Sequence, residues 1–268
     1  IAVAVNDKQE GPEWDRAEKF WANYGEDAAR LGETFKKKLG IKDLEQFGAS
    51  SAALNPKWRG KNNTPKTDLI GNKGSRKISL KKAGGSQLMS GGKEETISTF
   101  ESAMAMMGKS APKEVIRLID NLEAKMGQMN EKGTISALEK LRDSGSTLTP
   151  AQKQSIEQME NLQFSAKELN AEMNSVFQSL DFKQYFCYEA ATGVGKFAEP
   201  LAVANELVEF NPDSAAITKH LPMNKVTDAK FLAQTNKFYV SFKTGGGGSK
   251  PYLALRSGKV NFKQIVEE

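Results

Sequence analysis

The 268-residue sequence contains a single cysteine, Cys187, and a single histidine, His220. One thiol cannot form a disulfide within the chain, so nothing in the cysteine content indicates secretion. One cysteine and one histidine are also too few for a zinc site built from those two residue types. A Ser-His-Asp hydrolase would depend entirely on His220, and no nucleophile-elbow motif lies near it. A surface or hydrogen-bonded histidine is the simpler interpretation.

Long hydrophobic runs are also missing. No apolar stretch approaches the roughly 20 residues that a membrane-spanning helix requires. Charged residues make up 26% of the chain and the mean hydropathy is -0.53. The length is sufficient for one large domain or two small ones, each with a buried core. We therefore expect a soluble, cytoplasmic protein that has no membrane partner.

Acidic residues are scarce between positions 56 and 93, where Asp68 is the only one. The same stretch holds ten cations, whereas the whole chain carries a net charge of only +5: Lys57, Arg59, Lys61, Lys66, Lys73, Arg76, Lys77, Lys81, Lys82 and Lys93. Such a concentration of positive charge predicts a polyanionic partner, most simply nucleic acid. The alternative interpretation is a solvated, flexible loop.

The apolar spacing predicts helices over residues 12–40, with a break at Gly25, and irregular structure over 41–63. Residues 66–71 and 76–82 are short runs bounded by turn residues, and we predict a strand pair there. From 94 to 180 the apolar residues recur at helical spacing, which predicts three or four helices. Thr149 and Pro150 mark the start of one of them.

Strands are predicted again after residue 180. The candidate strands are residues 182–190, 205–212, 216–221, 237–243 and 251–256, with a short helix at 227–234 and a flexible tip at 244–250. We therefore predict an α+β fold, with a mixed sheet flanked by helices and divided in the sequence by a helical insertion. The predicted parts are residues 1–93 for the first half of the core, 94–180 for the insertion and 181–268 for the β-rich remainder.

Asp68 and Lys81 belong to the two predicted strands of the basic segment. In a hairpin they would lie close together at the edge of the sheet, and Ser79 would share a face with Lys81. A carboxylate can hold Mg²⁺, while a neighbouring lysine orients or deprotonates the attacking water and offsets phosphate charge. This pair is the minimum needed for metal-assisted hydrolysis of a phosphodiester.

The arrangement resembles the PD-(D/E)xK nuclease superfamily, which includes phage nucleases. The proline-aspartate half of the family motif resembles residues 65–68, and its (D/E)xK half resembles residues 79–81. Gln87 is similar to the glutamine of the exonuclease branch, and Glu18 matches the glutamate that the family often places on a preceding helix. The resemblance implies a DNA-cutting enzyme that uses Mg²⁺ or Mn²⁺, with RNA not excluded as substrate and a homodimer or a virion component as further partners.

The sequence departs from the family pattern at two positions. Pro65 lies three residues before Asp68 rather than next to it, and Ser79 replaces the second acidic residue. Glu189 is our candidate for the missing metal ligand. The resemblance further implies that Gln87 orients the substrate or the lysine, and that cations contact the nucleic-acid backbone: Arg59, Lys61, Lys66, Arg76, Lys77, Lys82 and Lys243.

Two other functions stay open at this point. The basic segment would equally serve a phage structural or DNA-end-binding protein that cuts nothing, with its lysines protecting an edge strand. Residues 189–197, EAATGVGKF, approach a phosphate-binding loop, which would indicate an NTPase. In that motif a Ser or Thr should follow Lys196, but Phe197 stands there.

Overall fold

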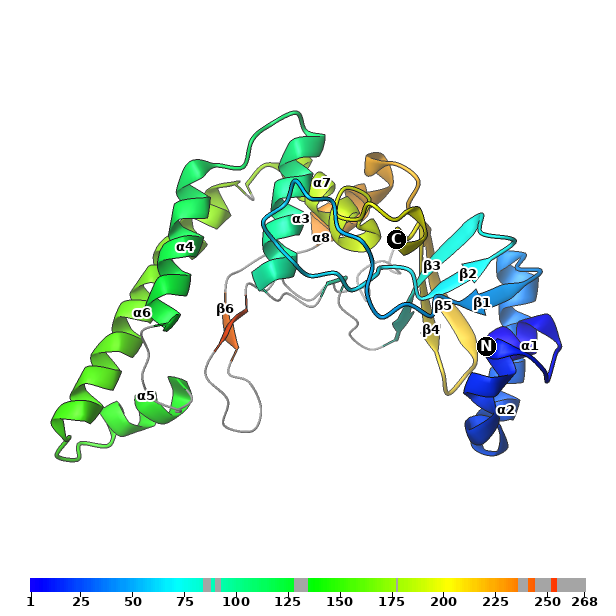
Figure 1. The fold of residues 1–268 in the computed structure, drawn as a ribbon, viewed down its shortest axis with the longest axis horizontal. Coiled ribbons are helices and arrows are strands. Elements are labelled where there is room, and N and C mark those ends of the chain that lie inside the picture. The colour runs from blue at the N-terminus through cyan, green and yellow to red at the C-terminus, as the bar shows by residue number, and fades with distance from the viewer. Residues whose placement is uncertain are drawn as a thin grey trace.

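The structure is a computed structural model that describes residues 1–83, 88–89, 93–127, 135–176, 178–235, 241–243 and 252–254. It forms an arch with a sheet at one end and a helical arm at the other (Figure 1). The sheet end contains helices α1 (Ala2–Asn6) and α2 (Pro12–Leu39) and the strands β1 (Leu44–Gln46), β2 (Leu69–Gly71), β3 (Arg76–Lys82), β4 (Glu206–Asn211) and β5 (Ala216–Pro222).

The five strands follow the order β1-β2-β3-β4-β5. Neighbours are antiparallel except β3 and β4, which are parallel and pair Ser79 with Leu207 and Lys81 with Glu209. The connection between these two central strands contains the whole helical insertion. A mixed sheet with helices, divided in the sequence by an insertion, confirms the predicted α+β fold.

Four helices form the insertion, and shorter elements follow it. They are α3 (Lys93–Met106), α4 (Lys113–Gly127), α5 (Ile135–Asp143) and α6 (Pro150–Val176), then α7 (Leu180–Thr192), the 3-10 turns η1 (Pro200–Ala202) and η2 (Val226–Ala229), and α8 (Lys230–Thr235). Strands β6 (Ser241–Lys243) and β7 (Tyr252–Ala254) form a separate antiparallel pair. Within the described residues, no helix combines the length and apolar character needed to cross a bilayer.

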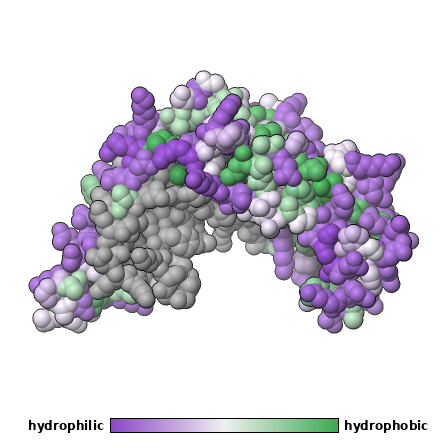
Figure 2. All heavy atoms as spheres, viewed as in Figure 1, coloured by the Kyte–Doolittle hydropathy of each residue, from purple (hydrophilic) through white to green (hydrophobic). Residues whose placement is uncertain are grey.

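The two faces of the sheet pack against different helices. Ile78 and Val208 join the core under α1 and α2, whereas Leu207 joins the core built by α3, α6, α7 and α8. Because strand side chains alternate, Ser79 and Lys81 of β3 lie on the face opposite Ile78. Figure 2 shows hydrophilic residues over both ends of the arch, with hydrophobic residues gathered toward its middle.

Helix α2 runs from Pro12 to Leu39 without interruption, so the predicted break at Gly25 is wrong. A glycine inside a helix costs about 1 kcal/mol relative to alanine, which a well-packed helix tolerates. The indole of Trp21 covers the position: a Cβ on Gly25 would lie 2.9 Å from its Nε1 atom. The helix ends where Gly40 adopts the left-handed conformation with φ 66°.

The predicted strand over residues 182–190 is also wrong, because this segment belongs to helix α7. Its aromatic content favours a strand by propensity alone, but tertiary packing overrides propensity. Phe182, Phe186 and Ala190 recur every four residues and are buried in the core. Ser179 caps the helix by accepting a hydrogen bond from the backbone N–H of Phe182 at 3.3 Å.

Candidate active site

A cavity of about 300 Å³ opens on the face of β3 that carries Ser79 and Lys81. Its walls come from the loop before β2, from β3, from residues 88–89 and from α3. The lining residues are Asn62, Thr64, Pro65, Lys66, Asp68, Ser79, Lys81, Leu88, Met89 and Glu95. The structure therefore brings the aspartate, serine and lysine of the sequence motif to one cavity, and it adds a second carboxylate, Glu95.

Asp68 is held firmly at the entrance to β2. Its backbone N–H donates to the carbonyl oxygen of Ile78 at 2.8 Å. Its side-chain Oδ2 accepts the backbone N–H of Leu80 at 2.7 Å, and the Ser79 hydroxyl lies 3.5 Å from the same oxygen. The other oxygen, Oδ1, accepts no hydrogen bond from the described residues. One oxygen thus fixes the carboxylate, and the second is left for a ligand.

Lys81 reaches the cavity because it follows Ser79 by two positions on β3. Partial burial lowers the pKa of its ammonium below the usual lysine value, and the positive charge of Lys66 acts in the same direction. The negative charges of Asp68 and Glu95 oppose this shift in pKa. A lysine with a lowered pKa is easier to deprotonate and is therefore better suited to proton transfer near neutral pH.

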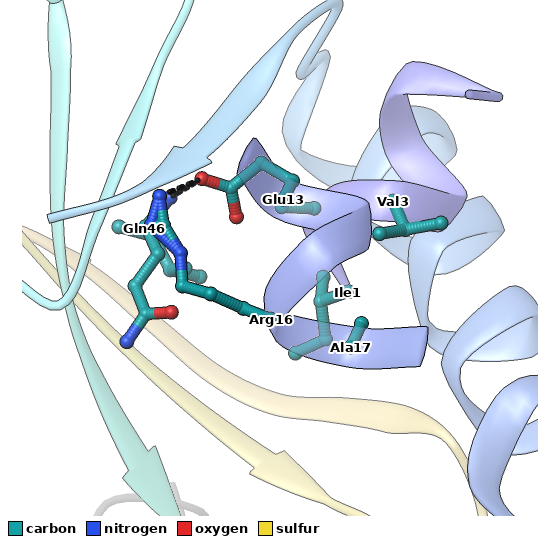
Figure 3. Close-up of a pocket in the computed structure, with 8 residues that line it drawn as sticks. Ile1, Val3, Glu13, Arg16, Ala17 and Gln46 are labelled. Carbon is teal, nitrogen blue, oxygen red and sulfur yellow. Dashed lines mark hydrogen bonds and ion pairs between the residues drawn. The ribbon is translucent and has the colours of Figure 1, made fainter. Parts of the chain in front are cut away.

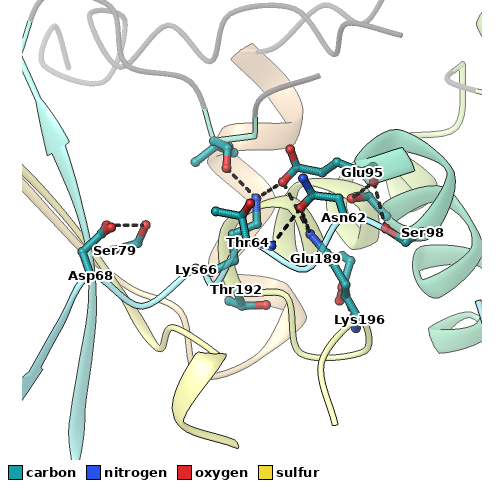
Figure 4. Close-up of polar contacts among 12 residues, drawn as sticks. Asn62, Thr64, Lys66, Asp68, Ser79, Glu95, Ser98, Glu189, Thr192 and Lys196 are labelled. Atoms are coloured by element: carbon teal, nitrogen blue, oxygen red, sulfur yellow. Dashed lines mark hydrogen bonds and ion pairs between the residues drawn. The ribbon is translucent and has the colours of Figure 1, made fainter. Parts of the chain in front are cut away.

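The opposite wall of the cavity carries a buried ion pair. Lys66 and Glu95 are 6% and 3% exposed, and the Lys66 Nζ atom lies 2.6 Å from Glu95 Oε1. The same ammonium donates to the carbonyl oxygen of Leu88 at 2.9 Å. Figure 4 shows Asp68 and Ser79 on the strand side and Glu95 on the helical side, with Lys66 between them. Removing one partner of such a buried pair leaves an uncompensated charge, so the pair fixes this wall of the cavity.

A second buried lysine, Lys196, contacts the same carboxylate of Glu95. The Lys196 Nζ atom donates to Asn62 Oδ1 at 2.7 Å and lies 3.7 Å from Glu95 Oε1. Burial lowers the pKa of Lys196 to about 8, and the charge of Lys66 adds to that shift. Glu95 and Glu189 act in the opposite direction. Glu95 is therefore shared by two buried lysines.

Glu189, our sequence candidate for the second metal ligand, does not line the cavity. It lies on α7 and is 1% exposed, and its carboxylate accepts the backbone N–H groups of Gly195 and Lys196 at 2.8 and 2.9 Å. Burial raises its pKa, and these hydrogen bonds oppose the rise. Glu189 therefore holds the loop that follows α7, and the prediction that it binds metal is corrected.

Substitutions at Glu189 test this structural role. We expect Glu189→Leu to lower the free energy of unfolding by about 3–5 kcal/mol, because two backbone N–H groups lose their acceptor and the buried Lys196 loses a nearby negative charge. Glu189→Gln keeps an acceptor oxygen and should cost about 1–3 kcal/mol. Urea unfolding measures both changes. A folded Glu189→Gln protein that binds no metal would restore Glu189 as a ligand.

Residues 189–197 do not form a phosphate-binding loop. Such a loop follows a strand and opens a helix, whereas here helix α7 ends at Thr192 and Gly193 adopts the left-handed conformation with φ 68°. Gly195 is required for close packing, because a Cβ there would lie 1.9 Å from the hydroxyl oxygen of Ser102. The lysine of the motif, Lys196, points into the buried ion-pair cluster. Gly193 therefore ends helix α7, and Gly195 allows close packing against Ser102.

The other predicted site residues lie in several places. Glu18 is exposed on α2 and does not line the cavity, so it is not brought to Asp68. Gln87 lies outside the described residues, and of Lys243 only the backbone, in β6, is described. Glu18 and Glu189 do not line the cavity, so its two carboxylates are those of Asp68 and Glu95.

The cations predicted to contact nucleic acid do not form one patch. Arg76 and Lys82 point to the α2 face of the sheet, away from Lys81, and Arg76 forms an ion pair with Glu206. Lys66 is buried in the cavity wall, and Arg59 pairs with Asp120. The contacts predicted at Lys66, Arg76 and Lys82 stay predictions, and these residues do not share the exposed surface of one element. Lys57 and Lys61 are exposed on the loop before β2, and Lys77, on the same face of β3 as Ser79, donates to the carbonyl oxygen of Pro200 at 3.1 Å.

Glu95 was missed because nothing near Lys81 in the sequence marks it. It stands fourteen positions after Lys81, beyond the strand, near the start of the next helix. Its neighbours Ser98 and Thr99 both donate hydroxyl hydrogen bonds to its carbonyl oxygen, at 3.1 and 2.7 Å. One signal in the sequence was its position: Glu94 and Glu95 are the first acidic residues after the basic segment of residues 56–93.

The potential ligand atoms that line the cavity are oxygens, the donor type that Mg²⁺ prefers. Two carboxylates, Asp68 and Glu95, and the Ser79 hydroxyl line it. Within the described part of the chain no cluster of three or more His, Cys, Asp or Glu residues is placed to hold a metal. Mg²⁺ in proteins commonly keeps several waters and takes one or two carboxylates together with substrate phosphates.

Another cavity, of about 200 Å³, lies between α1, the start of α2 and β1 (Figure 3). Glu13 crosses it, accepting the backbone N–H of Gln46 at 3.2 Å and pairing with Arg16 at 3.1 Å. Both contacts are made to the Oε1 atom of Glu13. This cavity lies on the α2 side of the sheet and does not share the face that carries Lys81.

Comparison of the chain with protein-family models, with curated proteins and with solved structures gave no match. We therefore take the function from the geometry of the cavity and from its chemistry.

Proposed function

We propose that the protein is a metal-dependent nuclease that hydrolyses DNA phosphodiester bonds and resembles the PD-(D/E)xK enzymes. The observation that carries the proposal is the meeting of Asp68, Ser79, Lys81 and Glu95 at one cavity. A carboxylate with an uncommitted oxygen and a lysine of lowered pKa are the two groups that this reaction requires. Exposed lysines beside the cavity would hold the nucleic-acid backbone.

The roles follow from the position of each group. Asp68 would hold the cation, with the Ser79 hydroxyl near it, and Glu95 faces them from the other side of the cavity. When bound, Mg²⁺ supplies a Lewis acid for the phosphate oxygen and lowers the pKa of a coordinated water. Lys81 orients the attacking water, accepts its proton when its amine is neutral, and offsets phosphate charge when its amine is protonated. Lys57, Lys61 and Lys77 contact neighbouring phosphates.

A non-catalytic DNA-binding protein is the second candidate, and one observation favours it. The position of the second acidic residue in the motif is occupied by Ser79, and the substitute carboxylate, Glu95, is already paired with Lys66. If that pair persisted in the presence of metal, the cavity would retain a single available carboxylate. The basic loop would then dock a phosphate backbone without cleaving it.

A cleavage assay on linear and supercoiled duplex DNA distinguishes the two candidates. We expect cleavage in Mg²⁺ or Mn²⁺, none in EDTA, and binding without cleavage in Ca²⁺. Single-stranded DNA and RNA of the same sequence, tested in parallel, define the substrate. Salt-sensitive DNA binding with no cleavage in either Mg²⁺ or Mn²⁺ would select the non-catalytic candidate.

A further inference from the structure

Asn62 lies on the loop before β2, and its side chain lines the cavity. Its Oδ1 atom accepts hydrogen bonds from the Lys196 ammonium at 2.7 Å and from the backbone N–H of Thr64 at 3.3 Å. Both of these groups can only donate, so the oxygen end of the amide must face them and the nitrogen end is turned away from them. The protein itself therefore sets the orientation of the Asn62 amide.

The group that holds this amide is buried, and it belongs to the glycine-rich segment of residues 189–197. The Lys196 side chain is 1% exposed, and the backbone N–H of Lys196 donates to Glu189 at 2.9 Å. This segment does not form a phosphate-binding loop, yet its lysine reaches the cavity wall through Asn62. A fixed and buried anchor keeps a polar side chain in one orientation before any ligand arrives.

The other end of the amide is a hydrogen-bond donor. Nδ2 of Asn62 carries two N–H groups, and neither has an acceptor among the described residues. Figure 4 shows Asn62 beside Glu95, on the far side of Lys66 from Asp68. The two lysines of the cavity, Lys66 and Lys81, balance its two carboxylates, so an entering phosphate meets no net negative charge there. A phosphate oxygen is a strong acceptor for a donor of this kind.

We propose that Asn62 is a substrate-binding residue, whose Nδ2 donates to a phosphate oxygen of the nucleic-acid backbone when that backbone enters the cavity. The inference rests on the proposed function, because it assigns a substrate contact in the same cavity. The amide is already held by Lys196 and Thr64, so little side-chain freedom is lost when the phosphate binds. The contact requires no change in the ion pair between Lys66 and Glu95.

Two substitutions separate this contact from a purely structural role. Asn62→Asp keeps an oxygen for Lys196 and Thr64 but replaces the N–H donors with an acceptor, whereas Asn62→Leu removes the donors without adding charge. We expect each to weaken the binding of fluorescein-labelled duplex DNA in Ca²⁺ by about 10–100-fold, measured by fluorescence anisotropy. Asn63→Asp adds the same charge at the exposed neighbouring position and should bind as wild type does.

Urea unfolding identifies the variants that fold, and Asn62→Asp remains the test if Asn62→Leu does not fold. Wild-type DNA affinity in a folded Asn62 variant, or an equal loss in Asn63→Asp, would overturn the inference. Duplexes of unrelated sequence should lose affinity equally, because phosphates carry no sequence information. A loss confined to one sequence would assign Asn62 to a base and reject the phosphate contact.

The inference and the proposed function fail in different ways. Weak binding by the Asn62 variants, together with a wild type that binds DNA but does not cleave it in Mg²⁺ or Mn²⁺, would remove the nuclease activity and keep the phosphate contact. Cleavage by wild type with unchanged DNA affinity in the folded variants would remove the inference alone. A wild type that binds no DNA would overturn both.

Discussion

Asp68→Asn is expected to lower Mg²⁺-dependent cleavage by about 10³-fold or more, which corresponds to about 4 kcal/mol of transition-state stabilisation. Asparagine keeps an oxygen for the backbone N–H of Leu80, which Asp68 now binds at 2.7 Å. The fold should therefore survive, whereas the charge that holds the metal is lost. Steady-state cleavage of duplex DNA in Mg²⁺ measures the effect, and urea unfolding of the same samples measures stability.

The matched control is Asp213→Asn, which removes one negative charge from the exposed turn between β4 and β5. We expect wild-type cleavage from it. Mn²⁺ binding should fall in Asp68→Asn and stay unchanged in the control. A folded Asp68→Asn protein that cleaves DNA at the wild-type rate would reject the assignment of Asp68 to the metal.

Lys81→Met is expected to lower cleavage by about 10²–10⁴-fold, the range typical for a positioned proton-transfer group. Asp68 and Glu95 remain in place, so metal binding should persist while the chemical step is lost. Single-turnover cleavage, with the protein in excess of the DNA and above the dissociation constant, separates the chemical step from binding. Lys81→Arg keeps the charge but cannot lose its proton at working pH, so it restores DNA affinity without restoring the rate.

The pH dependence of stability gives this variant a second readout. The pKa of Lys81 is lowered in the folded state, chiefly by burial. The unfolded chain therefore holds this proton more tightly, and wild-type stability rises with pH between the folded and the unfolded pKa. Below that interval the buried charge disfavours folding, and Lys81→Met should be at least as stable as wild type. Any difference in its favour should shrink as the pH rises through the interval.

A loss of stability in Lys81→Met that is largest at acidic pH and shrinks as the pH rises would contradict this account of Lys81. Wild-type cleavage by a folded Lys81→Met protein would remove its catalytic role altogether.

The part of the site carried by β3 was predictable because it depends on local rules. Strand alternation places Ser79 and Lys81 on one face, and the turn before Arg76 returns the chain to Asp68. The same rules, together with the helical spacing of apolar residues between 94 and 180, were sufficient to predict the α+β fold class. These features need no knowledge of distant contacts.

The rest of the site depends on long-range packing. The sequence of α7 is aromatic enough to suggest a strand, and only the core that receives Phe182 and Phe186 makes it a helix. That error placed Glu189 on the wrong element. Glu95 was missed for the same reason, because it meets Lys66 across twenty-nine residues and Lys196 across about a hundred. No local pattern encodes those contacts.

The most direct test of the central claim is to locate the cation in crystals soaked with Mn²⁺, using its anomalous scattering. The account predicts a peak in the cavity of Lys81 and Ser79, within about 2.0–2.3 Å of an Asp68 carboxylate oxygen. Saturated crystals of active protein in which Mn²⁺ binds elsewhere, and in which Asp68 has no metal, would contradict it.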